Sequence, residues 1–597
     1  MKKSSAGKRW QCAALAVLFV APLLALGQEK AGDKKAAPGV DMLWGVKIPM
    51  RDGVGLNATV FKPADQKEPL PVVFTLTPYI GDSYTDRAMY FARHGYVYAL
   101  VDVRGRGNSG GSFEPFANEG RDGHDVVEWL AQQPWSNGKV AMWGGSYAGF
   151  DQWATAKELP PHLATIVPAA AAHPGVDFPM QYNLTGPYLM RWLSFTSGHT
   201  GNGRLFGDYA FWSEKFFDLY AHHTAFRELD RLVGNPSPIF QKWLDHPTPD
   251  AYYDAMVPSP EQYARIKIPI LTITGAYDAD QPGALTYYTR HMRYGSPEAV
   301  ANHYLIFGPW DHPGTRTPRD EVGGLKFGPA SVLDLNDLHR QWYDWTMKSG
   351  PKPEFLKKRV AYYEVGAEEW KYADSIDSIA SGHRTLYLES DGTANDAFHS
   401  GYLRAEQGKT AAEDHYVYDP MDIRPGELER KEEEKPLLSQ RGALSLFGNG
   451  VVYHSDPFAA NTEITGVLKL TVWLAMDVPD TDLEADVYEI LPDGTSIALT
   501  SAAQQARYRE SLRQAKPVPP GEAIRYTFDN FTYFSRRIAE GSRLRLVVSC
   551  VNSINVTKNY NSGGDVSRET ARDARTAHIT VYHDAAHPSA LEIPLVQ

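Results

Sequence analysis

Apolar and polar residues alternate along the first third of this chain in a way that is typical of a layered α/β domain. Short apolar runs of strand length are separated by segments of helical period, such as the one around residues 124–132. The strand-like runs lie at residues 54–61, 72–77, 97–103, 139–142 and 163–167. Such alternation favours a mostly parallel sheet covered by helices. The pattern stops near Pro168 and resumes near Ile266, and apolar positions at helical spacing predict a last helix within residues 332–345.

The pattern changes again after residue 350. Short runs of strict alternation take over, among them residues 468–474, 486–490 and 543–550, with turn signals such as the Pro-Asp-Gly at 492–494. Many short strands separated by turns are typical of a β-sandwich. We therefore predict an α/β domain formed by residues 41–167 and 266–350, an insertion at 168–265, and an all-β domain at 351–597.

A glycine-rich turn at residues 143–149, W-G-G-S-Y-A-G, carries the strongest chemical signal. It follows an apolar strand-like run and precedes a helix-compatible segment, which is the setting of the nucleophile elbow of α/β-hydrolases. Glycines suit such a turn because its backbone is strained and neighbouring chains approach Ser146 closely. The usual pattern is G-x-S-x-G, whereas here Ala148 takes the last glycine position and Gly149 follows it. A glycine-rich structural turn is the alternative interpretation.

A nucleophilic serine needs a base, and the base needs a carboxylate to orient it. In α/β-hydrolases these residues follow in the order serine, acid, histidine. Here Asp278 follows the strand-like run at 270–274, and His312 follows the run at 303–307. Open α/β sheets place their chemistry in such loops after strand ends. Either residue alone would read as a turn aspartate or a surface histidine, but the three in this order predict a catalytic triad of Ser146, Asp278 and His312.

The chain resembles the cocaine-esterase-like (CocE/NonD) hydrolases and their relatives, the X-Pro dipeptidyl-peptidases and α-amino-acid ester hydrolases. The resemblance runs from about Trp44 to the C-terminus. It rests on I-P-M-R-D-G at 48–53, D-V-R-G-R-G at 102–107, Q-P-W-S-N-G-K-V at 133–140, the turn at 143–149, Y-D at 277–278 and G-P-W-D-H at 308–312. Together these motifs are specific for the family, but they are not specific for its substrate.

The resemblance implies further site residues. In this family a tyrosine hydroxyl after an early strand helps to bind the oxyanion, which implies Tyr79 here, with the backbone N–H of Tyr147 as the second donor. Members that hydrolyse α-amino acyl esters hold the substrate ammonium with carboxylates just after the triad aspartate. Asp280 stands there, although the next residue is Gln281, and Asp177 is a second candidate. An ordinary solvated turn residue is the alternative interpretation of Asp280.

The insertion is unusually aromatic, because 12 of the 43 residues from 178 to 220 are Phe, Trp or Tyr, about twice the share in the whole chain. An insertion after the strand that follows the elbow lies above the catalytic residues. We expect a helical cap that forms much of the acyl pocket, with Trp192 as a candidate substrate contact. A well-packed helical subdomain is the alternative. The resemblance also implies that the all-β domain is a jelly-roll sandwich.

The beginning of the chain predicts export. A basic segment at residues 1–9 precedes an apolar stretch at 12–26, and residues 25–27 fit a cleavage site. The apolar run is short for a membrane span, although an uncleaved anchor is the alternative. We therefore expect a signal peptide at 1–27, a linker at 28–40 and a periplasmic or secreted protein. Loss of residues 1–27 removes four positive and no negative charges, which changes the net charge from −12 to −16.

This negative charge argues against nucleic acid and anionic membranes as partners.

Cys550 shares the apolar face of an alternating run, so we interpret it as a core residue. The G-x-G-x-x-G at 105–110 lacks the following helix that a bound phosphate needs, so it does not predict a nucleotide site. Neither a metal nor another cofactor is expected, because the histidines and cysteines lack metal-ligand spacing.

These observations predict a serine hydrolase that cleaves an acyl ester or amide bond through an acyl-enzyme. Its substrate would be a small-molecule ester, an amide or a short peptide. One alternative is X-Pro dipeptidyl-peptidase or α-amino-acid ester hydrolase activity on substrates with a free amine. A non-enzymatic alternative is a secreted binding protein that uses its β-sandwich, and the complete set of triad candidates argues against it.

Overall fold

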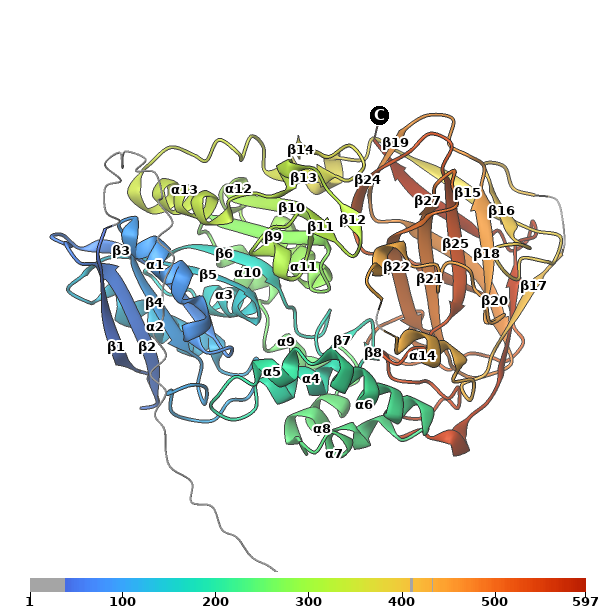
Figure 1. The fold of residues 1–597 in the computed structure, drawn as a ribbon, viewed down its shortest axis with the longest axis horizontal. Helices are drawn as coiled ribbons and strands as arrows, with labels where there is room; N and C mark the ends of the chain where they lie inside the picture. Colours follow the sequence, from blue (N-terminus) through green and yellow to red (C-terminus); the bar gives the residue numbers. More distant parts are fainter. Residues whose placement is uncertain (1–37, 409–411, 432, 597) are drawn as a thin grey trace, which may run out of the picture. The chain divides into compact units, whose positions relative to one another are not determined.

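The computed structural model describes residues 38–408, 412–431 and 433–596. The predicted signal peptide at 1–27 and most of the predicted linker lie outside the described residues. Among the helices within the described ranges, none combines the length and the apolar character needed to cross a bilayer. Two large sheets organise this part of the chain, one of ten strands and one of thirteen (Figure 1).

The ten-stranded sheet has the order β1-β2-β4-β3-β5-β6-β9-β10-β13-β14. Its strands are β1 (Val40–Pro49), β2 (Gly55–Pro63), β3 (Leu70–Thr77), β4 (Val97–Asp102), β5 (Ser136–Ser146), β6 (Leu163–Ala171), β9 (Ile270–Tyr277), β10 (His303–Asp311), β13 (Val360–Glu364) and β14 (Glu369–Ala373). In sheet order, the strands from β4 to β13 pair in parallel. The edge strands β1, β2 and β14 pair antiparallel. The predicted mostly parallel sheet is confirmed.

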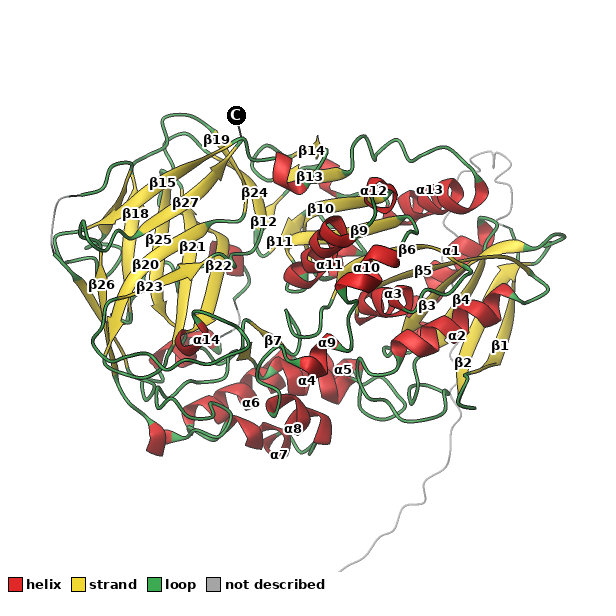
Figure 2. Cartoon of the chain, turned by 180° about the vertical axis from the view of Figure 1, so that it is seen from behind, coloured by secondary structure: helices red, strands yellow, loops and turns green. Residues whose placement is uncertain are grey.

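Helices cover both faces of this sheet, because its inner strands are apolar on both sides (Figure 2). The helices are α1 (Thr85–Arg93), α2 (Glu119–Ala131), α3 (Tyr147–Lys157), α10 (Pro260–Arg265), α11 (Gln281–Tyr294), α12 (Pro297–Ala301) and α13 (Leu335–Lys348). Val72 packs in one core with residues of α2, α3, α10 and α11, and its neighbour Val73 packs in another core with residues of α1 and α13. Adjacent strand residues thus face different helical layers, as the period of two requires.

Two boundaries differ from the expectation. β6 continues through Pro168 to Ala171, past the predicted boundary at residue 167. The catalytic sheet also continues after residue 350, because β10 pairs with β13 and β13 pairs with β14. Short alternating strands look alike in sequence whichever sheet they join, and for this reason the pattern alone assigned β13 and β14 to the all-β domain.

The insertion is mainly helical, as predicted. It contains β7 (Met180–Gln181), β8 (Leu184–Thr185), α4 (Tyr188–Phe195), α5 (Gly203–Phe206), α6 (Tyr209–Ala221), α7 (Leu229–Leu232), α8 (Pro238–Leu244) and α9 (Ala251–Asp254). Its large side chains Trp192 and Trp243 are buried in the same apolar core as Phe150 of α3. The insertion therefore packs against the helix that begins directly after Ser146.

The second large sheet belongs to the C-terminal all-β domain, which confirms the predicted fold class. Its strands are β15 (Gly382–Glu389), β16 (Gly401–Arg404), β17 (Asp414–Tyr418), β18 (Gly450–Ser455), β19 (Thr462–Gly466), β20 (Lys469–Met476), β21 (Asp482–Ile490), β22 (Ser496–Gln505), β23 (Ile524–Phe528), β24 (Phe534–Ile538), β25 (Arg543–Cys550), β26 (Ala577–Tyr582) and β27 (Ala590–Leu595). A two-stranded ribbon, β11 (Glu321–Val322) and β12 (Leu325–Lys326), and the helix α14 (Arg424–Glu429) accompany the two sheets. Cys550 is buried in the core of this domain, as expected.

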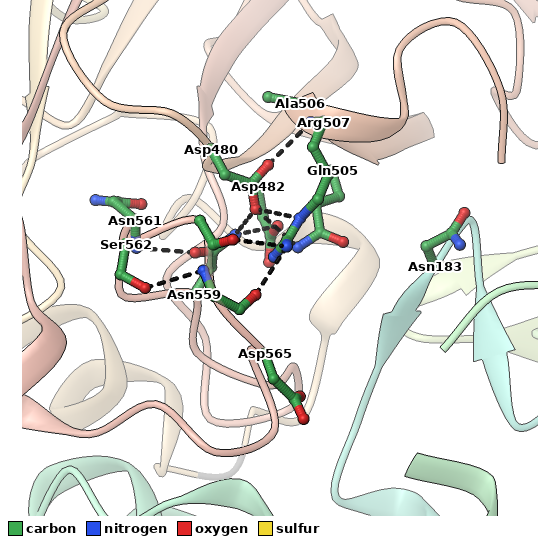
Figure 3. A network of polar contacts seen from close by, with 12 residues as sticks. Asn183, Asp480, Asp482, Gln505, Ala506, Arg507, Asn559, Asn561, Ser562 and Asp565 are labelled. Carbon is green, nitrogen blue, oxygen red and sulfur yellow. Dashed lines mark hydrogen bonds and ion pairs between the residues drawn. The ribbon is translucent and has the colours of Figure 1, made fainter. Parts of the chain in front are cut away.

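A buried polar network joins loops of the all-β domain to one another (Figure 3). Asp480 accepts a hydrogen bond from Asn559, and Nε of Arg507 lies 2.8 Å from the Asp480 carboxylate. Nearby, the side-chain amide of Asn183, between β7 and β8, donates to the carbonyl of Leu512 at 2.9 Å. The insertion is thus in contact with the all-β domain as well as with the catalytic sheet.

Candidate active site

Ser146 ends strand β5 and directly precedes helix α3, which is the predicted strand-turn-helix setting. Its backbone has φ 63° and ψ −127°. A non-glycine residue in such a sparsely populated region carries strain of about 1–3 kcal/mol, which the surrounding structure must hold in place. This strained turn is the geometry that presents the serine of a nucleophile elbow.

Close packing explains the glycines around Ser146. A Cβ atom on Gly144 would lie 2.6 Å from Cβ of Ala148. A Cβ atom on Gly149 would lie 2.8 Å from Cα of Ala171 in β6. The alanine in place of the usual last glycine is therefore accommodated, because Gly144 leaves room for its methyl group.

The hydroxyl of Tyr79, just after β3, lies 3.2 Å from Oγ of Ser146. The indole N–H of Trp192 donates to the same Tyr79 oxygen, also at 3.2 Å. Burial raises the pKa of Tyr79, so its hydroxyl keeps its proton and can donate it in a hydrogen bond. An oxygen atom next to Ser146 would thus meet a hydrogen-bond donor.

Asp278 and His312 follow β9 and β10, two adjacent parallel strands. Oδ1 of Asp278 and Nδ1 of His312 are 2.7 Å apart, and Asp278 is only 3% exposed. The backbone N–H of Asp280 also donates to Oδ1 of Asp278 at 3.0 Å, which helps to fix that carboxylate. Because Nδ1 of His312 is held by Asp278, Nε2 is the ring nitrogen that is able to exchange a proton.

The structure brings Tyr79 to Ser146 and Asp278 to His312, but it does not join the two pairs by a hydrogen bond. Within the described residues, the Ser146 hydroxyl is hydrogen-bonded to Tyr79 and not to His312. The strands β5, β6, β9 and β10 are successive neighbours in the sheet, so both pairs lie at the same carboxyl edge. Catalytic hydrogen bonds are often long or poorly aligned before a substrate binds.

Asp280 is not the solvated turn residue that the sequence left open, because its side chain is only 17% exposed. Its Oδ2 lies 3.8 Å from Nδ1 of His312. Burial, reinforced by the charge of Asp278, raises the pKa of Asp280 to about 6. Burial disfavours the charged imidazole of His312, but the negative charges of Asp278 and Asp280 outweigh it and raise the pKa of His312.

Asp177, at the beginning of the insertion, belongs to the same electrostatic environment. Its carboxylate accepts hydrogen bonds from the backbone N–H groups of His173 at 2.7 Å and Gly283 at 2.6 Å. Burial and the charges of Asp280 and Asp278 raise the pKa of Asp177 well above its ordinary value. The neighbouring carboxylates of Asp280 and Asp278 therefore disfavour the ionisation of Asp177.

The side chain of Tyr147 is fixed by partners that the sequence did not indicate. Its hydroxyl donates to Oε1 of Glu119 at 2.6 Å and accepts the backbone N–H of Phe116 at 2.6 Å. Burial raises the pKa of Glu119 to about 7. Glu119 lies on α2 with no motif around it, so only the packing of α2 against α3 reveals this contact.

The G-x-G-x-x-G segment supports the site through Arg106. This side chain is fully buried, and its guanidinium donates to the carbonyl of Pro78 at 2.8 Å. It also donates to the carbonyl oxygens of Gly198 and Thr200 in the insertion. Arg106 thus ties the residue before Tyr79 to the insertion, a role for which the sequence offered no signal.

Comparison with known proteins matches nearly the whole chain to one family. Residues 52–314 match the X-Pro dipeptidyl-peptidase (S15 family), and residues 355–592 match the X-Pro dipeptidyl-peptidase C-terminal non-catalytic domain. A cocaine esterase from Rhodococcus sp. (strain MB1 Bresler) is 26% identical over 589 residues, which cover 92% of this chain and 98% of that protein.

Two solved structures share the fold at low sequence identity. An aminopeptidase from the marine sediment archaeon Thaumarchaeota archaeon aligns with a TM-score of 0.79 and 21% identity, covering 94% of this chain and 97% of the other. An α-amino acid ester hydrolase aligns with a TM-score of 0.79 and 20% identity, covering 95% of this chain and 100% of the other. The solved structures show the shared fold. The matches to both domains of the family, together with the likeness to the cocaine esterase, show that the chain belongs to the X-Pro dipeptidyl-peptidase (S15) family and is a serine hydrolase.

Proposed function

We propose that this protein cleaves acyl esters through Ser146, His312 and Asp278, with a covalent acyl-enzyme as intermediate. The observation that carries the proposal is the hydroxyl of Tyr79 at 3.2 Å from Oγ of the strained Ser146. This is the place where the oxyanion of an acyl-transfer reaction would develop. The likeness to a cocaine esterase over nearly the full length supports an ester rather than an amide as substrate.

In the proposed reaction, Oγ of Ser146 attacks the carbonyl carbon and its proton passes to Nε2 of His312. The carbonyl electron pair moves onto the oxygen, which the Tyr79 hydroxyl and the backbone N–H of Tyr147 stabilise. Collapse of this intermediate expels the alcohol, which takes the proton from His312. A water molecule, deprotonated by His312, then releases the acid and restores Ser146. Asp278 holds the imidazole in place throughout through its contact with Nδ1.

The hydrogen bond between Ser146 and Tyr79 fits the state that precedes substrate binding. A substrate carbonyl oxygen would take the place of the serine hydroxyl at Tyr79. Ser146 could then rotate about its Cα–Cβ bond toward His312. The triad would thus be assembled by the substrate that it attacks.

The test is the turnover of a chromogenic acyl ester by Ser146→Ala, His312→Ala and the double variant. Each single substitution should lower kcat by about 10⁴-fold or more, and the double variant should lose little more, because residues that act as one unit are not additive. Losses that multiply in the double variant would mean that the two residues do not share one chemical step.

We propose α-amino acyl esters as a second candidate substrate class, on the strength of Asp177 and Asp280. Both carboxyl groups have raised pKa values, for which burial is the largest cause; neighbouring carboxylates add to it, Asp280 and Asp278 in the case of Asp177, and Asp278 in the case of Asp280. A substrate ammonium would relieve this repulsion, since a cation gains more from a carboxylate in a partly dehydrated cleft than in water. Both residues lie at the start of α11, because Asp280 directly precedes the helix and Asp177 accepts the backbone N–H of Gly283 in its first turn.

The discriminating variant is Asp280→Asn, assayed with an aminoacyl ester and with the matched ester that lacks the amine. If the second candidate holds, the plateau value of kcat/KM above the rising limb of each pH profile falls for the aminoacyl ester and is spared for the other. An equal response of both esters, or no response of either, would leave a simple carboxylic ester hydrolase as the better description. Asp177→Asn provides an independent repeat, because Asp177 makes no contact with His312.

We further propose that the protein is exported and loses residues 1–27. The basic start and the short apolar stretch that follows support this proposal. N-terminal sequencing of protein from the periplasm or medium should begin near Gln28. Recovery of a chain with an intact Met1 in the membrane fraction would favour an anchor instead.

A further inference from the structure

One side chain of the insertion, Trp192, contacts both residues that supply the proposed oxyanion donors, Tyr79 and Tyr147. Trp192 lies on α4 and is only 4% exposed, so it offers little surface to a substrate. Its indole N–H donates to the hydroxyl oxygen of Tyr79 at 3.2 Å. Its ring also stacks on the ring of Tyr147, with 5.7 Å between centroids and 20° between planes.

The contact with Tyr79 determines what its hydroxyl can do. A buried tyrosine hydroxyl can accept and donate hydrogen bonds. Because Trp192 donates to the Tyr79 oxygen, the Tyr79 proton remains available for the atom on the other side, which is Oγ of Ser146 at 3.2 Å. A hydrogen bond accepted by a hydroxyl also strengthens the one that it donates.

The same helix restrains the ring of Tyr79. Phe195, one turn after Trp192 on α4, stacks on Tyr79 with 5.5 Å between centroids and 18° between planes. Arg106 meanwhile links the carbonyl of Pro78 to the loop that follows α4. Both the ring and the backbone next to Tyr79 are therefore held by contacts that reach the insertion.

The contact with Tyr147 concerns the second donor. The Tyr147 ring packs against Trp192 and Phe116, with 4.7 Å between the centroids of Tyr147 and Phe116, and the rings of Trp192 and Phe116 also stack on each other at 6.4 Å. Its hydroxyl is held by Glu119 at 2.6 Å. A ring fixed at both its face and its tip restricts the backbone of the residue that carries it, which is the first residue of α3.

We infer that Trp192 is a positioning residue that aligns both oxyanion donors, so that the oxyanion site is complete only while α4 is packed against the elbow. This replaces the substrate contact expected for Trp192 from the sequence. The inference rests on the proposed function, because it acts through Tyr79 and Tyr147. It makes the insertion a part of the catalytic apparatus rather than only a wall of the pocket.

The test is a double-mutant cycle between Trp192→Phe and Tyr79→Phe, with kcat and KM measured on one chromogenic ester. Phenylalanine keeps a ring to stack on Tyr147 and removes the N–H that reaches Tyr79. We expect Trp192→Phe to lower kcat about five- to tenfold with KM nearly unchanged, which is the scale of one neutral hydrogen bond. In the Tyr79→Phe background the same substitution should have almost no further effect.

A matched control is Trp243→Phe. Trp243 is buried in the same cluster, with its ring centroid 6.3 Å from that of Trp192. Trp243→Phe measures how much kcat changes when an indole of this aromatic cluster is replaced without loss of the hydrogen bond to Tyr79. It should leave kcat within about twofold of wild type. If Trp192→Phe fails to fold, replacement of Trp192 by benzothienylalanine removes the N–H while the size of the ring is kept.

A second readout is inhibition by benzeneboronic acid, whose serine adduct places an oxygen in the oxyanion site. The inhibition constant of benzeneboronic acid should be larger in Trp192→Phe than in the wild type, by the same factor by which kcat falls. A raised KM with unchanged kcat, or equal losses in both Tyr79 backgrounds, would overturn the inference and return Trp192 to substrate binding. In that case a large effect of Tyr79→Phe alone would leave the proposed function standing, whereas no effect of Tyr79→Phe would contradict both.

Discussion

Oδ2 of Asp280 lies 3.8 Å from Nδ1 of His312, the same ring nitrogen that is hydrogen-bonded to Asp278 at 2.7 Å. Two carboxylates therefore act on one imidazole. Burial works against the charged ring, and the two negative charges outweigh it, so the pKa of His312 is raised. His312, the base of the proposed triad, therefore loses its charge at a higher pH than an ordinary histidine does.

This relationship predicts a shifted pH profile. The neutral form of His312 is the one that accepts the serine proton, so kcat/KM should rise with pH through a midpoint above about 6.5. Asp280→Asn removes one of the charges that raise this pKa, and the rising limb should therefore move to lower pH. The measurement is kcat/KM for an uncharged ester between pH 5 and 9.

The matched control for this profile is Asp320→Asn, which neutralises an exposed carboxylate in the loop after β10. It should leave the limb in place, because an exposed charge is screened by water and salt. A limb that stays unmoved in Asp280→Asn, or that moves to higher pH, would show that Asp280 does not act on His312.

Tyr79→Phe should lower kcat by about 100-fold and change KM little. One lost oxyanion donor costs about 3 kcal/mol in comparable sites, and the ring that stacks on Phe195 is kept. Steady-state kinetics on one ester separate the two parameters. A large rise in KM with nearly normal kcat would assign Tyr79 to substrate binding.

Gly144→Ala should damage both stability and turnover. The new methyl group would lie 2.6 Å from Cβ of Ala148 and 2.8 Å from its carbonyl oxygen, so the turn that presents Ser146 must shift. Overpacking of this kind costs about 1–3 kcal/mol. Thermal unfolding and ester turnover together measure the effect.

Two further variants sharpen this prediction. Gly55→Ala is the control, because a Cβ atom there would meet no atom within 4 Å. Ala148→Gly, added to Gly144→Ala, removes the nearest contact and should recover part of the lost activity. Equal behaviour of Gly144→Ala and Gly55→Ala would contradict the packing account of the elbow.

Local sequence patterns predicted the elements that carry the site. Ser146, Asp278 and His312 each follow an apolar run within five residues, and chain order together with the rule for strand ends was enough to nominate them. The elbow was recognised despite Ala148, because the strand, the glycines and the helix occur in sequence around it. Strands, turns and helix starts of this kind are determined largely by residues that are close together in the chain, and a single sequence shows those residues directly.

Contacts between distant segments could not be predicted in this way. The hydrogen bond from Trp192 to Tyr79 joins residues 113 positions apart and depends on where the insertion folds back onto the sheet. Arg106 stands in one of the motifs that carry the family resemblance, but nothing in the local sequence indicated its contacts with Pro78, Gly198 and Thr200. β13 and β14 alternate like the strands of the all-β domain, and only their pairing with β10 assigns them to the catalytic sheet.

The most direct test of the account is covalent labelling of the purified protein with a fluorophosphonate, followed by peptide mapping. This reagent reacts with a serine only where a base activates it, so we expect one modified residue, Ser146, with complete loss of ester turnover as labelling proceeds. Ser146→Ala should fold, remain unlabelled and lack turnover. Label on another residue, or undiminished turnover in Ser146→Ala, would contradict the assignment of Ser146 as the nucleophile.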